Sequence, residues 1–137
     1  TNEVTKSIPT GQGANRMLKV NNLVYVTNNG GYGFDNTVVI INSNTDEVGE
    51  TITVGDNPNG IVSDADGNLW VTSSGAIAYN EDWTVNEANS TKGAVSKITS
   101  NAEVLRLNMA SVSYGGAGGL SISPDGKTIY YQFEGTI

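Results

Sequence analysis

The chain contains 137 residues, of which 37% are hydrophobic and 15% are charged, and its formal net charge is −7. This length suits one domain, and the hydrophobic content suffices for a core and excludes a disordered acidic segment. The negative charge argues against binding to nucleic acid or to anionic membranes, and no apolar run is long enough to span a bilayer.

The first residues of the chain resemble a later segment. Residues 1–11 align with residues 45–55, and Thr, Glu, Val, Ile and Gly recur at matching positions. The offset of about 44 residues is typical of a four-stranded propeller blade. We therefore predict that residues 1–11 form the last strand of a preceding blade whose other strands lie outside this segment.

Residues 12–55 fit one complete blade. β-branched residues and apolar alternation indicate strands, and the short polar side chains of residues 42–46 favour a turn. The four predicted strands cover residues 15–20, 23–28, 36–42 and 47–54.

Residues 56–109 repeat the pattern, with an inserted loop at residues 76–92 that is predicted to hold a helical turn near residues 81–83. Asp66-Gly67 favours a tight turn, because glycine adopts positive φ readily. The four predicted strands cover residues 60–63, 69–73, 94–99 and 103–108. Residues 110–137 begin a third copy, in which the two predicted strands cover residues 119–123 and 128–133.

Several of these segments resemble known propeller repeats. Tyr25-Val26-Thr27-Asn28 matches the signature of the YVTN-type repeat of bacterial and archaeal surface-layer and periplasmic proteins, and residues 123–127 resemble its inner turn. Residues 64–72 are also similar to the propeller repeats of bacterial two-component sensors. The resemblance implies an all-β partial propeller of four-stranded antiparallel blades: one outer strand, two full blades and two inner strands. It also implies an extracytoplasmic location, in the periplasm or at the cell surface.

An incomplete ring leaves apolar faces and sheet edges uncovered, and such surfaces favour association. The expected partners are therefore the remaining blades of the same protein or another copy of the chain. A glycan or a peptide is the expected ligand, whereas nucleic acid and membrane insertion are not expected.

Strand direction alternates along each blade, so the long connections are expected to meet on one face. Long aromatic loops on a rigid scaffold commonly bind ligands. Trp83 follows two carboxylates and could stack on a sugar or peptide, with the acids binding hydroxyls or amines. Alternatively, the loop aromatics pack the loops onto the sheet edges. The candidate ligand-binding residues are Arg16, Tyr32, Phe34, Asp35, Tyr79, Glu81, Asp82, Trp83 and Tyr114.

The chain contains no cysteine and no histidine, which excludes disulfides, thiolate metal sites and imidazole catalysis. Asp64, Asp66 and Asn68 resemble the start of an EF-hand loop, but the sixth and twelfth positions do not fit, and a polar turn explains them. We therefore predict no metal site, no cofactor and no catalytic residue.

The expected function is a non-catalytic extracytoplasmic binding or scaffold module. One alternative is a fragment of a propeller enzyme, lyase-like or glycosidase-like, whose catalytic residues lie in other blades. Another alternative is a sensor-type propeller domain.

Overall fold

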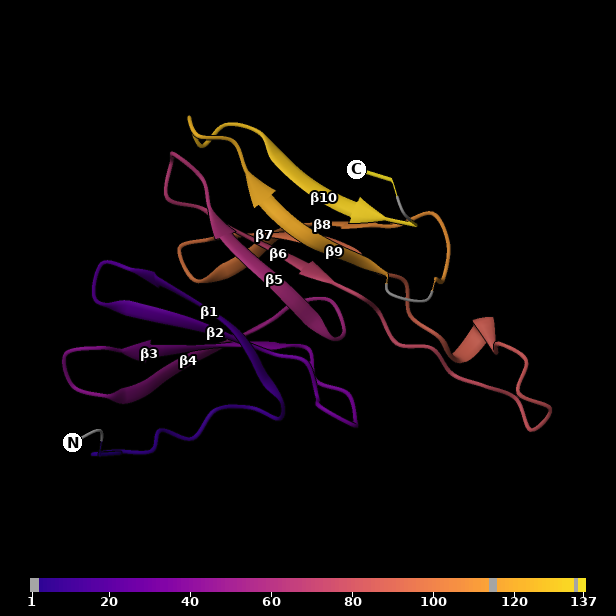
Figure 1. Cartoon of the computed structure of the whole chain (residues 1–137), viewed down its shortest axis with the longest axis horizontal. Coiled ribbons are helices and arrows are strands. Elements are labelled where there is room, and N and C mark those ends of the chain that lie inside the picture. Colours follow the sequence, from indigo (N-terminus) through magenta and orange to yellow (C-terminus); the bar gives the residue numbers. More distant parts are fainter. Residues whose placement is uncertain (1–2, 114–115, 135) are drawn as a thin grey trace.

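Antiparallel β-strands account for nearly all of the regular structure (Figure 1). The computed structural model describes residues 3–113, 116–134 and 136–137. Within them, the strands form two four-stranded sheets and one two-stranded sheet, each with strands in sequence order. The all-β, antiparallel prediction is confirmed, and the three sheets do not close into a ring across the described residues.

The first sheet contains β1 (Ala14–Val20), β2 (Leu23–Asn28), β3 (Thr37–Asn42) and β4 (Glu47–Thr53). Asn21 and Asp46, with φ angles of 53° and 56°, occupy the tight turns that join β1 to β2 and β3 to β4. Asparagine and aspartate tolerate this left-handed conformation better than other side chains. Each predicted strand of this sheet is therefore present, with ends shifted by at most a residue.

The second sheet contains β5 (Pro58–Ser63), β6 (Leu69–Ser73), β7 (Ala94–Thr99) and β8 (Ala102–Asn108). A short 3₁₀ helix, η1 (Glu87–Asn89), lies in the long connection between β6 and β7. The helical turn predicted near residues 81–83 is wrong, because these residues form a tight turn and the helix comes later. The third sheet pairs β9 (Ala117–Ile122) with β10 (Ile129–Phe133).

The sheets stack face to face. One core cluster joins Tyr25, Val38 and Ile52 of the first sheet to Val71 and Ile98 of the second. A second cluster joins the other face of the second sheet to the β9–β10 hairpin, and its members are Val95, Met109 and Ala117, with Trp70, Tyr131 and Phe133 packed against them. Successive side chains of a strand point to opposite faces of its sheet, and the apolar residues of the second sheet therefore form two interfaces, one on each of its faces.

The segment before β1 has no strand between residues 3 and 10. Ile8 packs on the outer face of the first sheet, against the cluster of Val26, Val39 and Ile41. Lys6 lies near Asp46, with 3.8 Å between Nζ and Oδ2. A β-strand forms beside a neighbouring strand whose backbone N–H and C=O groups are free to pair with it. That residues 1–11 form the last strand of a preceding blade therefore stays a prediction, because the other strands of that blade lie outside this segment.

Candidate functional site

The long connections of the first two sheets meet at one end of the strands, which we call the loop end (Figure 1). The chain before β1 bonds to the loop after β2: Asn29 N–H donates to Gly13 O (2.9 Å), and Gly30 N–H donates to Gln12 O (2.8 Å). At the far side, Met109 N–H donates to Gly93 O (2.8 Å). Backbone hydrogen bonds therefore connect the loops of the loop end to one another, so that they are not independent.

Asp35, a candidate binding residue, holds the first part of this surface together. Its Oδ2 accepts from the N–H of Gln12 (2.9 Å). Its Oδ1 accepts from the N–H (2.9 Å) and the hydroxyl (2.6 Å) of Thr37. Because both oxygens already accept hydrogen bonds from the protein, the geometry assigns Asp35 a structural role in the loop.

The sequence analysis missed Asp56, Asn57 and Thr91, which join the first loop to the next. Asn57 N–H donates to Asp35 O (2.8 Å), and its side-chain Nδ2 donates to Gly75 O (2.9 Å). Thr91 Oγ1 donates to Asp56 Oδ2 (2.7 Å). Asn57 has a φ of 56° and directly precedes Pro58. This Asn-Pro pair is typical of turns, and it is the one sequence signal that could have revealed the contact between the two loops.

Residues 75–92 form an arm that projects from the loop end (Figure 1). Antiparallel bridges pair Ala76 with Thr91 and Tyr79 with Val85, so the two sides of the arm lie against each other. Its tip is a tight turn in which Asn80 N–H donates to Thr84 O (2.9 Å) and Trp83 N–H donates to Asn80 O (3.0 Å). The arm is thus an ordered hairpin-like element.

Trp83 stands at the tip of the arm with 83% of its surface exposed. Its φ is 64°, a conformation that is uncommon for a bulky side chain and that the turn holds in place. The Tyr79 ring lies nearby, with 6.4 Å between ring centroids and 49° between ring planes. Of the candidate aromatic residues, the structure brings Tyr79 and Trp83 together.

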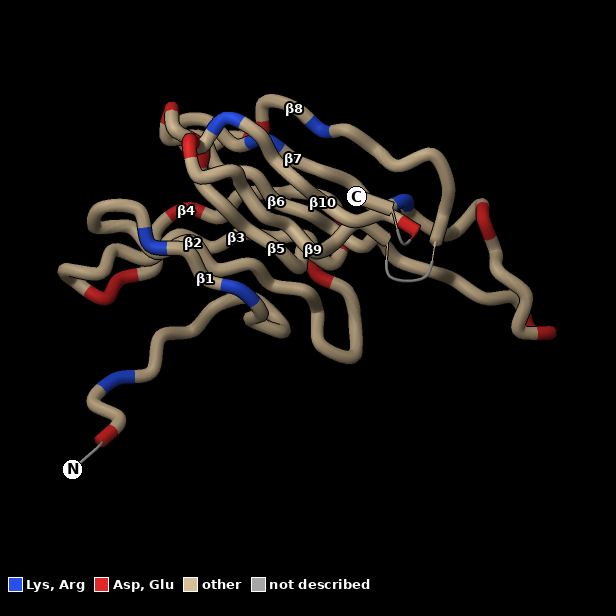
Figure 2. The backbone as a smooth tube through the Cα atoms, turned by 45° about the horizontal axis from the view of Figure 1, so that its top comes forward, with Lys and Arg blue, Asp and Glu red and all other residues tan. Residues whose placement is uncertain are grey.

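The acidic residues of the arm differ in their contacts. Asp82 Oδ1 accepts from the hydroxyl (2.6 Å) and the N–H (3.1 Å) of Thr84, and these bonds lower the pKa of Asp82. Glu81 is exposed beside it. Glu87 lies in the first turn of η1, and the arm shows acidic but no basic residues before Lys92 (Figure 2).

The remaining candidates are dispersed. Tyr32 and Phe34 are exposed on the loop between β2 and β3. Arg16 is exposed on β1, where its N–H donates to Thr27 Oγ1 (3.0 Å). Tyr114 lies outside the described residues. The eight candidates among the described residues therefore do not form one cluster, and the arm is where exposed aromatic and acidic groups coincide.

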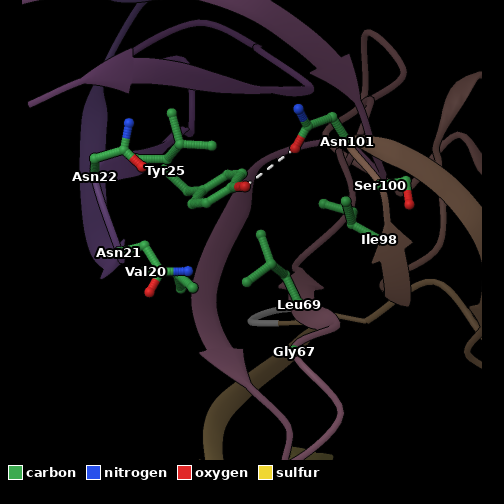
Figure 3. A pocket seen from close by; sticks show the side chains of 10 residues that line it. Val20, Asn21, Asn22, Tyr25, Gly67, Leu69, Ile98, Ser100 and Asn101 are labelled. Carbon is green, nitrogen blue, oxygen red and sulfur yellow. Dashed lines mark hydrogen bonds between the residues drawn. The ribbon is translucent and has the colours of Figure 1, made fainter.

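A pocket of about 240 Å³ lies at the opposite end, where the turns of the first two sheets meet (Figure 3). Val20, Leu69 and Ile98 give it an apolar lining, and Asn21 and Asn101 line it with amides. The Tyr25 hydroxyl donates to Asn101 Oδ1 (3.0 Å), a bond between the two sheets. Burial raises the pKa of Tyr25, so its hydroxyl stays a hydrogen-bond donor.

The Asp64 carboxylate of the EF-hand-like segment, residues 64–68, accepts hydrogen bonds from neighbouring residues of the protein. Asp64 accepts from the N–H groups of Asp66 (3.0 Å) and Asn68 (2.8 Å) and from Trp70 Nε1 (2.9 Å). Burial raises the pKa of Asp64, but the bonds from Trp70, Asn68 and Asp66 outweigh that effect and hold it below its ordinary value. Asp64 therefore closes a turn and fastens Trp70 to it.

No group of three or more acidic side chains gathers closely enough to hold a metal ion within residues 3–113, 116–134 and 136–137. The same described residues include no helix that is long and apolar enough to cross a membrane. A comparison with curated proteins found no match. The profile of the family described as "Domain of unknown function (DUF5074)" matches residues 1–137, and the chain therefore belongs to this family.

Proposed function

We propose that the chain is a non-catalytic, extracytoplasmic binding or scaffold module that presents its loop end to a ligand. The observation that carries this proposal is Trp83, an exposed aromatic side chain on an ordered arm. Exposure of a large apolar side chain to water is unfavourable. A ligand that covers the Trp83 ring therefore binds with a favourable contribution to the free energy. The extracytoplasmic location is supported by the YVTN-like residues 25–28 alone.

The finer fold proposal is that the three sheets are consecutive blades of a propeller. Their shared strand order and the repeated face-to-face packing support it, since each sheet covers the front of the one before. In this arrangement the remaining blades belong to the same protein or to another copy. The loop end then corresponds to one face of the ring.

The ligand class that suits the arm is a glycan or a peptide. Trp83 and Tyr79 offer tilted ring faces on which a sugar or an apolar side chain can stack. Glu81 offers an exposed carboxylate to a hydroxyl or an amine, whereas Asp82 is held by Thr84. Binding would thus combine one stacking contact with one charged hydrogen bond.

The test is a screen of glycans and cell-wall peptides, followed by titration of the strongest binder against variants. Trp83→Ala should weaken binding at least about tenfold, a loss of about 1.4 kcal/mol. Tyr79→Ala should weaken it less, because Tyr79 acts partly by supporting Trp83. Tyr130→Ala is the matched control, since Tyr130 is an exposed aromatic residue on β10 and not on the arm. Unchanged affinity in both arm variants would contradict the proposal.

A further inference from the structure

The pocket between the turns of the first two sheets lies at the end of the strands opposite to the loop end, and the ligand surface of the arm does not use it. Figure 3 shows that its floor is shared between the sheets, with Tyr25 from β2, Leu69 from β6 and Ile98 from β7. These three side chains are at most 7% exposed and belong to the core cluster that joins the two sheets. The shape of the floor is therefore fixed by close packing.

Two turns from different sheets form the mouth of this pocket. Asn21 and Asn22 lie in the turn between β1 and β2, and Ser100 and Asn101 lie in the turn between β7 and β8. The mouth is open to solvent, since Asn21, Asn22 and Ser100 are exposed. The pocket measures about 240 Å³. An apolar cavity of roughly 150 Å³ holds benzene, so this pocket has room for a small organic group.

The asparagine side chains at the mouth keep hydrogen-bonding capacity that the protein does not use. Within the part of the chain that the structure describes, the side-chain amides of Asn21 and Asn22 have no hydrogen-bond partner. Asn101 Oδ1 accepts from the Tyr25 hydroxyl (3.0 Å), and Asn101 Nδ2 makes one long bond to Glu50 Oε2 (3.3 Å). Because a primary amide offers two N–H donors and a carbonyl acceptor, a ligand with a donor and an acceptor can bond to both turns.

Turn geometry explains two of these three asparagines and leaves Asn22 unexplained. Asn21 and Asn101 have φ angles of 53° and 61°, a left-handed conformation that asparagine tolerates. Asn22 is not among the described residues with a positive φ. Its backbone oxygen accepts from the N–H (2.8 Å) and the hydroxyl (3.1 Å) of Ser43, and these bonds do not involve the Asn22 side chain. The Asn22 amide is therefore free to serve a ligand.

The pocket favours an uncharged ligand. Among the described residues, those that line it carry no charged side chain. A carboxylate or an ammonium group would lose its hydration there without a charged partner, which is unfavourable. Glu50, which bonds to Asn101 at the rim, would in addition repel a carboxylate. The suitable group is therefore neutral, with an apolar part for the floor and an amide for the mouth.

We propose that this pocket binds a small uncharged ligand that carries an acetamido group, as an N-acetylated sugar does. The acetamido group combines a methyl group, an N–H donor and a C=O acceptor without charge. Its methyl group packs on Leu69 and Ile98, and its amide bonds to the asparagine side chains of the two turns. The sugar ring stays at the mouth, between the exposed turns. This proposal does not rest on the ligand surface of the arm.

The test is a titration of N-acetylglucosamine into the isotope-labelled full chain, followed by NMR. Saturable shifts are expected at the side-chain amides of Asn21, Asn22 and Asn101. Glucose lacks the acetamido group, and glucosamine carries an ammonium group in its place. Both sugars should bind at least about tenfold more weakly, because the first leaves the asparagine amides unpaired and the second brings a charge into the pocket.

Variants assign the contact. Asn22→Asp should weaken binding of N-acetylglucosamine at least about tenfold, because it replaces the amide donors by a charge at a neutral pocket. Asn22 is exposed and its side chain has no partner among the described residues, so the spectrum of the unliganded variant should show a folded protein. The matched control is Asn44→Asp, the same change at an exposed residue in the turn between β3 and β4.

The arm provides the second control. Trp83→Ala should leave the shifts of the pocket asparagines unchanged, which separates failure here from failure of the ligand surface proposed for the arm. Absent shifts, or shifts confined to the arm, would overturn the inference. Equal affinity for glucose, tighter binding of glucosamine, or equal affinities of Asn22→Asp and Asn44→Asp would overturn it as well.

Discussion

At the scale of single residues, Asp64 shows how a polar turn is maintained. Its carboxylate collects hydrogen bonds from Asp66, Asn68 and the Trp70 indole. A motif that resembles a calcium loop in the sequence is thereby satisfied without a cation. The pKa of Asp64 lies below its ordinary value because the charged form accepts these bonds.

Asp64→Asn is predicted to lower the free energy of unfolding by about 1 kcal/mol at neutral pH. A carboxyl group whose pKa is depressed by folding stabilises the fold above its unfolded pKa, and the effect is lost as pH falls through the folded value. The difference between the two proteins should therefore be constant above about pH 5 and shrink below 3.8. Urea titrations at several pH values measure it, with Asp66→Asn as the control. A difference that grows on acidification would contradict this account.

Gly75 and Gly67 allow backbone strain to be separated from crowding. Both have left-handed φ angles, +77° and +80°. A Cβ at Gly67 would meet nothing within 4 Å, whereas one at Gly75 would lie 2.4 Å from Thr91 O. Alanine at Gly67 is predicted to cost about 1 kcal/mol, and alanine at Gly75 about 1–3 kcal/mol more. Thermal or urea unfolding measures both, and equal losses would show that the base of the arm is not tightly packed.

At the scale of elements, the contact between the first two sheets combines an apolar core with one hydrogen bond at its rim. The Tyr25 hydroxyl of β2 donates to Asn101 in the turn between β7 and β8. Tyr25→Phe is predicted to cost about 1 kcal/mol. A double-mutant cycle with Asn101→Ala should give a coupling of similar size, whereas additive losses would show that the bond contributes nothing.

Truncation of a side chain to alanine is predicted to lower the stability by different amounts at a buried position and at an exposed position of the outer strands. Ile52→Ala leaves a cavity in the core cluster and should cost about 2–4 kcal/mol. Leu107→Ala removes a half-exposed side chain and should cost less than about 1 kcal/mol. Equilibrium unfolding of both variants measures the ratio. A large loss at Leu107 would mean that its face is already covered in solution.

At the scale of the whole molecule, local patterns were sufficient for the strands and insufficient for the arm. The pattern of β-branched residues, bounded by Asx or Gly turns, predicted a strand at residues 94–99, and these are the bounds observed for β7. The prediction succeeded because such signals are local in the sequence. The arm has no such period. Its geometry follows from hydrogen bonds between residues far apart in sequence, such as Thr91 to Asp56.

The same limit applies to the candidate site. Composition indicated that Trp83 and Tyr79 belong to a long loop, but only coordinates show that the rings lie together and that Trp83 is exposed. Asp35 looked like a binding group in the sequence, and its bonds to Gln12 and Thr37 give it a structural role. Carboxylates in turns serve ligands or backbone equally well, so sequence alone does not separate the two uses.

The central claim is that the first two sheets pack face to face through one core cluster, so that their central strands are stabilised together. Amide hydrogen exchange of the full chain at neutral pH tests it most directly, since exchange reports which backbone groups are paired. The account predicts slow exchange, of similar degree in both sheets, throughout the central strands β2, β3, β6 and β7, because each of them is paired on both sides. Slow exchange in β2 and β3 combined with fast exchange throughout β6 and β7 would contradict it, because the two sheets would then not be stabilised together.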